Sequence, residues 1–193
     1  MGAFHHSTAC PHIRSAYMGK CVKEGLIFGL KSAFEVSITR TEPKLSNQPG
    51  VSRRVNIEGQ LEVHTAVKDR ADFAFSSGGT TFVVDSTSGV AVPPGVSAKA
   101  LRCVGLHASF IEAKKRLEYR AWHFGAPNEF VPFALDNKGM LSMTSLHFLQ
   151  RMKIHAKRLD RFRGTKRFWE ALSIGLAKGS AHGFALMAQG DGT

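Results

Sequence analysis

The stretch "RADFAFSSGGTTFVVDST", residues 70–87, contains two short apolar runs joined by Ser-Ser-Gly-Gly, and it decides the fold. Alternating side chains, a glycine-rich turn and a second apolar run predict a β-hairpin. The continuous run Phe82-Val83-Val84 is typical of a buried central strand. Asp72 and Asp85 mark the two ends of this hairpin, in a chain with 26 Lys and Arg but only 15 Asp and Glu. The two acids are either ordinary strand-end residues or ligands of one metal ion.

Helices and strands are expected on both sides of the hairpin. The patterns predict a helix over 13–33, a strand over 34–42, short strand-like pieces over 53–70, a helix within 97–124, a strand over 129–135 and helices over 145–162 and 166–187. Pro132 favours an edge position for its strand. Gly19, Gly25 and Gly29 each weaken the first helix by up to about 1 kcal/mol. The order of elements predicts a mixed α/β domain with helices around a central sheet.

The composition favours a nucleic-acid partner. The chain has 193 residues, enough for one well-buried domain, and a formal net charge of +11. A basic chain of this size more often binds nucleic acid than an anionic membrane, although the charge also fits a merely solvated surface. No apolar run approaches the roughly 18–20 residues that cross a bilayer. Three scattered cysteines, Cys10, Cys21 and Cys103, indicate free buried thiols and a reducing, intracellular setting.

The aspartates suggest phosphodiester chemistry if they share a metal ion. Carboxylates at adjacent strand ends suit Mg²⁺, which can activate water and stabilise a phosphate during cleavage. Such a site usually needs one further cation. Lys115 is the candidate, because it lies four residues before Tyr119 at the margin of a buried helix face. A small shift of the helix would bring Lys114 inward instead.

A longer ordered series strengthens this hypothesis. Arg70-Ala71-Asp72 is followed by a gap of twelve residues and Asp85, then by Lys115-x-x-x-Tyr119, and then by FVPFAL. This series resembles the C-terminal restriction-endonuclease-like domain of non-LTR (LINE-type) retrotransposon polyproteins, which has the PD-(D/E)XK nuclease fold. The flanking segments GLKSAFEVSITRTEPKL and KRFWEALSIGLAKGSAHGF also resemble the family, so the likeness covers roughly residues 5–190.

The resemblance implies a fold and a set of roles. The expected fold is a restriction-endonuclease-like core with a central mixed sheet flanked by helices, over residues 13–140, and a basic helical extension over 141–193. Asp72 and Asp85 would hold Mg²⁺ or Mn²⁺, Lys115 would supply the catalytic cation, and Tyr119 would support them. Ala71 departs from the preferred proline. No lysine stands two residues after Asp85, so the cation must come from the helix, as it does in this family.

The family also carries a zinc knuckle just before the nuclease core. His5 and Cys10 have its His-x4-Cys spacing, and His12 takes the place of its following histidine. The first two cysteine ligands have no counterpart here, and half a ligand set cannot hold zinc tetrahedrally. We therefore expect residues 1–12 to be a tail, a remnant of the knuckle, and no zinc to be bound.

Residues 151–167 contain eight Lys and Arg residues and one acid. They form either a surface that binds the phosphates of a nucleic-acid backbone or the solvated face of a helix. The expected DNA contacts are Arg70, Lys157, Arg158, Arg161, Arg163, Lys166 and Arg167. Glu24 is either a supporting acid of the site or an ordinary exposed glutamate.

Three functions follow from these patterns. The first is a Mg²⁺-dependent endonuclease that nicks target DNA in the nucleus, so that the freed 3′-OH primes reverse transcription. Its partners would be target DNA, with element RNA as a further candidate, and a reverse transcriptase in a longer parent chain or in trans. The second is a truncated, decayed retrotransposon fragment that at most binds nucleic acid. The third, an RNA-associated basic protein, lacks a supporting aromatic motif.

Overall fold

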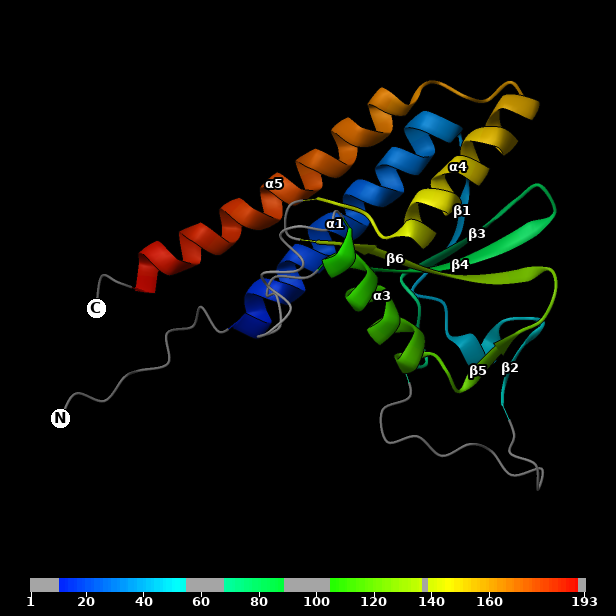
Figure 1. The fold of residues 1–193 in the computed structure, drawn as a ribbon, viewed down its shortest axis with the longest axis horizontal. Coiled ribbons are helices and arrows are strands. Elements are labelled where there is room, and N and C mark those ends of the chain that lie inside the picture. The colour runs from blue at the N-terminus through cyan, green and yellow to red at the C-terminus, as the bar shows by residue number, and fades with distance from the viewer. Residues whose placement is uncertain (1–10, 55–67, 89–104, 137–138, 191–193) are drawn as a thin grey trace.

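The structure, a computed structural model, describes residues 11–54, 68–88, 105–136 and 139–190, with side chains from Tyr17 to Ala181 within these ranges. The elements are α1 (Pro11–Phe34), β1 (Ile38–Thr41), the 3-10 turn η1 (Leu45–Asn47), β2 (Val51–Arg53), β3 (Phe73–Ser77), β4 (Thr80–Ser88), α3 (Leu106–Glu118), β5 (Trp122–Phe124), β6 (Asn128–Leu135), α4 (Met143–Arg158) and α5 (Thr165–Gly190). Figure 1 shows their arrangement. None of the helices in these ranges is both long and apolar enough to cross a membrane.

A four-stranded mixed sheet forms the centre of the fold. Its strand order is β1-β3-β4-β6, with β1, β3 and β4 antiparallel and β4 parallel to β6. A second, two-stranded antiparallel sheet pairs β2 with β5. Helices pack around the larger sheet, so the expected α/β fold with a mixed central sheet flanked by helices is confirmed. Among the described strands, β6 lies at an edge of this sheet and contains Pro132. The expected edge position of the Pro132 strand is therefore confirmed.

The two faces of the sheet are covered differently. Phe82 and Val84 of β4 pack into a hydrophobic cluster with residues of α1, α4 and α5. Val83, whose side chain points to the other face, packs with Tyr119 and Trp122 from the end of α3 and from β5. Asp85 follows the same alternation as Val83 and therefore projects toward α3. The α4 and α5 helices lie on the opposite face.

The hairpin forms where it was predicted. The β3–β4 ladder pairs Phe73 with Val84 and Ser77 with Thr80. Gly78 and Gly79 make the turn, with φ values of 58° and 79°, in the left-handed region that glycine adopts without strain. Because the turn sets the register, it also determines which residues of the two strands face each other.

Three predicted boundaries are wrong. The helix expected over 145–162 ends at Arg158, and Leu159 caps it. The strand expected over 34–42 begins only at Ile38, because α1 continues through Phe34, whose ring packs against Phe162 and Phe168. The helix expected within 97–124 ends at Glu118, and Trp122 instead begins β5 opposite Arg53. Residues 55–67 and 97–104, where further elements were expected, lie outside the described residues.

Gly25 of α1 has a packing role, although the sequence indicated only that it weakens the helix. In Figure 1, α1 and α5 run side by side in opposite directions. A Cβ built on Gly25 would lie 2.8 Å from the carbonyl oxygen of Ala171, and one on Gly175 would lie 2.5 Å from that of Cys21. Both clashes are with backbone, so these glycines permit the close approach of the two helices. Cys21 is buried with a free thiol, as expected.

Candidate active site

Four residues expected to act together are brought to one place. Asp72 lies directly before β3, Asp85 lies within β4, Lys115 is in the last turn of α3, and Tyr119 is the residue that caps this helix. Lys115 and Tyr119 are four residues apart and so share one face of the helix. The central strand and the end of α3 thus place two acids, an ammonium group and a phenol in one cluster.

Asp85 is the centre of the cluster and is completely buried. Its Oδ2 lies 2.8 Å from Nζ of Lys115, and its Oδ1 accepts hydrogen bonds from Nζ of Lys68 at 2.8 Å and from the Tyr119 hydroxyl at 2.7 Å. The same hydroxyl lies 2.5 Å from the carbonyl oxygen of Arg70. Partners of this kind compensate the cost of burying a carboxylate.

Asp72 is held by the residue next to Asp85. Its Oδ2 accepts the backbone N–H of Ser86 at 2.7 Å and the Ser86 hydroxyl at 2.6 Å. Burial and the negative charge of Asp85 nevertheless raise the pKa of Asp72, against the opposing effect of the Ser86 hydrogen bonds. The charge of Asp85 therefore lies close enough to affect the ionisation of Asp72, and the charge at Asp72 is not fully compensated.

The ionisation of Lys115 and Tyr119 limits what each can do. Burial tends to lower the pKa of Lys115, but the charge and hydrogen bond of Asp85 outweigh it, and the pKa is raised. Burial and then the charge of Asp85 raise the pKa of Tyr119 as well. At neutral pH both groups keep their protons. Each can therefore donate hydrogen bonds or, for Lys115, neutralise an anion, but neither can accept a proton.

Three residues of the cluster were missed by the sequence reading. Lys68 contacts Asp85, Glu118 lies 3.0 Å from Lys115, and Ser86 holds Asp72. Glu118 could have been found from its spacing of three residues after Lys115, and Ser86 from its place beside Asp85. Lys68 precedes β3 in an irregular segment, so no periodic pattern indicated it. Lys114, the alternative to Lys115, is exposed.

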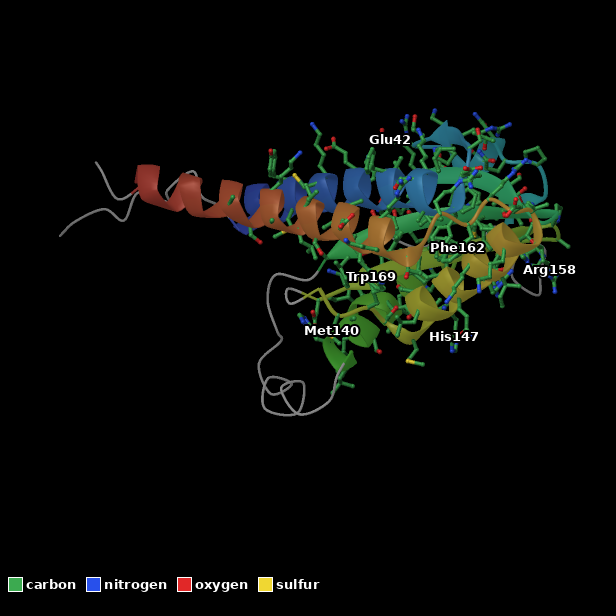
Figure 2. All side chains as sticks on the ribbon, turned by 90° about the horizontal axis from the view of Figure 1, so that it is seen from above. Glu42, Met140, His147, Arg158, Phe162 and Trp169 are labelled. Carbon is green, nitrogen blue, oxygen red and sulfur yellow. The ribbon has the colours of Figure 1, made fainter. Side chains whose placement is uncertain are left out.

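Of the expected nucleic-acid contacts, only Arg70 lies beside this cluster. Arg70 is exposed. The other predicted cations are all exposed and lie at the end of α4, in the α4–α5 connection and at the start of α5: Lys157, Arg158, Arg161, Arg163, Lys166 and Arg167. Figure 2 labels Arg158 and Phe162 in this region. These helices pack on the face of the sheet opposite to Asp85, so the basic stretch and the cluster belong to different sides of the sheet.

Some of these cations already have partners. Arg163 pairs with Glu35 at 2.5 Å, Lys166 lies 3.7 Å from Glu170, and the Lys157 ammonium lies 5.7 Å from the centre of the Phe162 ring. Glu24 is exposed on α1. His5 and Cys10 lie outside the described residues, as does the side chain of His12.

The donor chemistry of the cluster fits a hard divalent cation. Asp72 and Asp85 offer carboxylate oxygens, the ligands that Mg²⁺ prefers, and burial and then the charge of Asp85 raise the pKa of Asp72. Among the described residues, no three or more His, Cys, Asp or Glu side chains form a group that could hold a metal ion. A cation here would therefore rest on two carboxylates and on oxygens of water and substrate, which is the usual arrangement for Mg²⁺.

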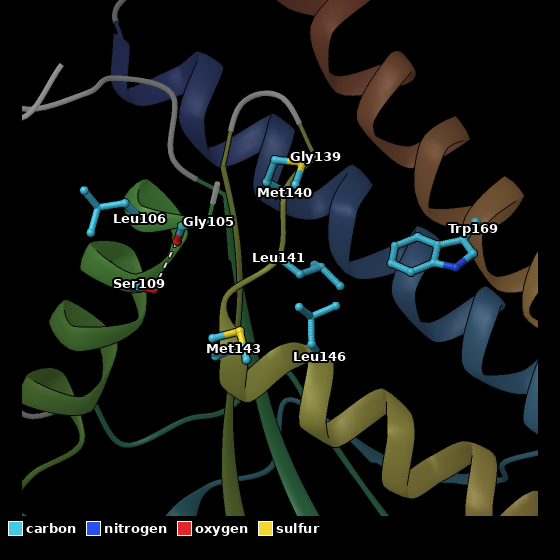
Figure 3. Close-up of a pocket in the computed structure, with 9 residues that line it drawn as sticks. All are labelled: Gly105, Leu106, Ser109, Gly139, Met140, Leu141, Met143, Leu146 and Trp169. Carbon is cyan, nitrogen blue, oxygen red and sulfur yellow. Dashed lines mark hydrogen bonds between the residues drawn. The ribbon is translucent and has the colours of Figure 1, made fainter. Parts of the chain in front are cut away.

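A separate hollow has a different character. Figure 3 shows it between the start of α3, the β6–α4 connection and α5, with Leu106, Met140, Leu146 and Trp169 among its lining residues. None of the residues that line it is ionisable. It therefore offers an apolar surface and no acid–base or metal chemistry.

Comparison with protein-family models and with curated proteins gives no match for this chain.

Proposed function

We propose that the chain is a Mg²⁺-dependent DNA endonuclease domain of the restriction-endonuclease-like type, from a non-LTR retrotransposon. It would nick target DNA in the nucleus, so that the freed 3′-OH primes reverse transcription. The observation that carries the proposal is the gathering of Asp72, Lys115 and Tyr119 around the buried carboxylate of Asp85. Their order along the chain is that of the family it resembles.

The roles follow from the contacts. Asp72 and Asp85 would hold Mg²⁺, which when bound supplies Lewis-acid stabilisation of the phosphate. Lys115 keeps its proton and would donate a hydrogen bond to the attacking water or to a phosphate oxygen. Tyr119 holds Asp85 in place through its hydroxyl, and Ser86 holds Asp72. Both carboxylates are thereby oriented before substrate arrives.

One observation favours a second candidate, a retrotransposon fragment that binds nucleic acid without cutting it. Asp85 already contacts two ammonium groups, those of Lys68 and Lys115. A carboxylate paired in this way is stable without a metal ion. Under the endonuclease proposal Lys68, whose side chain is 41% exposed, would give up its contact with Asp85 when Asp85 holds the cation.

Plasmid nicking separates the two candidates. Supercoiled plasmid is incubated with the protein and Mg²⁺ or Mn²⁺, and the wild type is compared with Asp85→Ala and with the isosteric Asp72→Asn. Asp160→Asn, in the exposed connection after α4, is the matched control. The endonuclease proposal expects nicking by the wild type and Asp160→Asn, and none by a folded Asp72→Asn. Nicking by all variants, or by none while DNA is still retained in a gel shift, contradicts it.

A further inference from the structure

Beside the cluster lies a hollow of about 320 Å³ that combines aromatic rings with guanidinium groups. Its lining residues are Arg54, Arg116, Tyr119, Arg120, Trp122, Phe124 and Phe130. Four are aromatic, three are arginines and none is acidic. This volume is at the lower end of the roughly 300–1,000 Å³ typical of small-ligand sites.

Three of the aromatic residues form a continuous set of rings. The centres of the Tyr119 and Phe130 rings are 4.4 Å apart, and those of Phe124 and Phe130 are 5.2 Å apart with a 19° angle between the planes. Phe124 and Phe130 are half-buried, so part of each ring reaches the surface. Such rings offer the flat faces on which a nucleic-acid base stacks.

The three arginines of the lining are exposed. Arg54 is anchored by its backbone N–H, 2.7 Å from the Ala121 carbonyl, and by its Nε, 3.3 Å from the Trp122 carbonyl. Arg116 pairs with Glu112 at 2.8 Å, and Arg54 and Arg120 are the other two guanidinium groups of the lining. Guanidinium groups bind phosphate oxygens in a planar, two-pronged geometry.

We propose that this hollow binds one unpaired nucleotide of a nucleic-acid strand, with its base on the Phe124–Phe130 rings and its phosphate on Arg54 and Arg120. The base must be unpaired, because in a duplex both of its faces are covered by neighbouring bases. The hollow accepts DNA or RNA through the same stacking and phosphate contacts. It deepens the proposed endonuclease function but does not depend on cleavage.

The hollow and the cluster share Tyr119. The ring of this residue lines the hollow, while its hydroxyl contacts Asp85. Both lie on the α3 side of the sheet, whereas the basic stretch of α4 and α5 packs on the other side. An unpaired nucleotide in the hollow would therefore be within one side chain of the carboxylates, which suits a strand that is opened next to the cleavage point.

Trp122 provides the probe, because the chain has only two tryptophans. Trp169→Phe removes the other one, which lies in α5, and leaves Trp122 as the single fluorophore. This protein is titrated with hexathymidylate, with hexauridylate, with a duplex of equal length, with thymidine monophosphate and with inorganic phosphate. We expect quenching by the two single strands, a much weaker effect of the monophosphate and none of phosphate or duplex. The relative affinity for hexathymidylate and hexauridylate shows whether the hollow prefers DNA or RNA.

The role of Arg54 and Arg120 in binding is tested by comparison with a double variant that changes the net charge equally on α1. Arg54→Gln/Arg120→Gln should weaken hexathymidylate binding about tenfold or more, in line with loss of two charged phosphate contacts. Lys20→Gln/Lys31→Gln, on the exposed side of α1, should change it less than about twofold. If the double variant does not fold, Arg120→Gln alone takes its place, and it should weaken hexathymidylate binding about threefold. Equal losses in both double variants, or binding without quenching of Trp122, overturn the proposal.

The two proposals fail separately. A wild type that never nicks plasmid but binds hexathymidylate through Arg54 and Arg120 excludes the endonuclease and supports the nucleotide site. A wild type that nicks plasmid without any quenching of Trp122 excludes the nucleotide site alone.

Discussion

Nζ of Lys115 lies 2.8 Å from Oδ2 of Asp85, and this contact joins the last turn of α3 to the central strand β4. Asp85 is completely buried, while 13% of the Lys115 side chain is exposed. A pair this well shielded from water affects both the stability of the fold and the charge of the cluster. Together with the hydrogen bond from the Tyr119 hydroxyl to Asp85, it fixes the position of the helix relative to the carboxylates.

Replacing Lys115 by Met should lower the free energy of unfolding by about 2–3 kcal/mol. Breaking a buried pair usually costs roughly 3–5 kcal/mol, and Lys68 and Tyr119 still contact Asp85 in this variant. Urea denaturation measures the change. Lys114→Met, at the exposed neighbouring position, should change stability by less than about 0.5 kcal/mol. Equal losses in the two variants would show that Lys115 does not pair with Asp85.

Replacing Tyr119 by Phe removes a hydroxyl and keeps the ring. Asp85 then loses a buried hydrogen bond, which should cost about 1–3 kcal/mol of unfolding free energy. Since the raised pKa keeps Tyr119 protonated, the residue acts as a donor and not as a base, and nicking should slow without being abolished. Stability and nicking rate are measured together. Complete loss of nicking in a folded Tyr119→Phe protein would contradict this supporting role.

The raised pKa of Asp72 predicts a pH-dependent difference between the wild type and Asp72→Asn. At pH values above its raised pKa, ionised Asp72 destabilises the fold through burial and through repulsion by Asp85, whereas Asn can still accept from Ser86. Asp72→Asn should therefore be the more stable protein at neutral pH. The stability conferred by a protonated Asp72 grows as the pH falls from the raised pKa toward the ordinary value of 3.8.

Below that value both proteins carry a neutral side chain at this position, so the difference should disappear. Urea midpoints of the two proteins between pH 7 and pH 3.5 test the expectation. A wild type that is the more stable protein at neutral pH would contradict it.

The hairpin and its acids could be predicted because local rules determine them. Gly78 and Gly79 indicate the turn, the turn sets the register, and the register places Asp85 in a buried strand. The choice between Lys114 and Lys115 depended on the phase of α3, because a shift of one residue along the helix would turn Lys114 inward instead. The structure shows that Lys115 faces the strand.

Lys68 and the glycines of the α1–α5 contact could not be predicted in the same way. Lys68 reaches Asp85 from a segment without a periodic pattern. Gly25 and Gly175 are 150 positions apart, so their shared role depends on how two distant helices pack. Single-sequence patterns describe faces of helices and strands, but they do not specify which distant faces meet.

Binding of Mg²⁺ should stabilise the wild type. A cation at ten times its dissociation constant adds about 1.4 kcal/mol, which raises the melting temperature of a chain of this size by roughly 3–6 °C. Asp72→Asn should lose this rise, because it removes one of the two carboxylates, while Asp160→Asn should keep it. Differential scanning calorimetry with Mg²⁺ and with EDTA measures the shift. A rise of equal size in Asp72→Asn would place the cation elsewhere.

The α1–α5 contact predicts opposite effects for two glycine-to-alanine changes. A Cβ at Gly175 would lie 2.5 Å from the Cys21 carbonyl oxygen, so Gly175→Ala must push the helices apart and should cost about 1–3 kcal/mol. A Cβ at Gly19 meets no atom within 4 Å, so Gly19→Ala should gain about 0.5–1 kcal/mol from helix propensity. Urea denaturation of both variants provides the comparison. If Gly175→Ala were as stable as Gly19→Ala, the two helices would not pack at the separation described, because no close contact would then oppose the added methyl group.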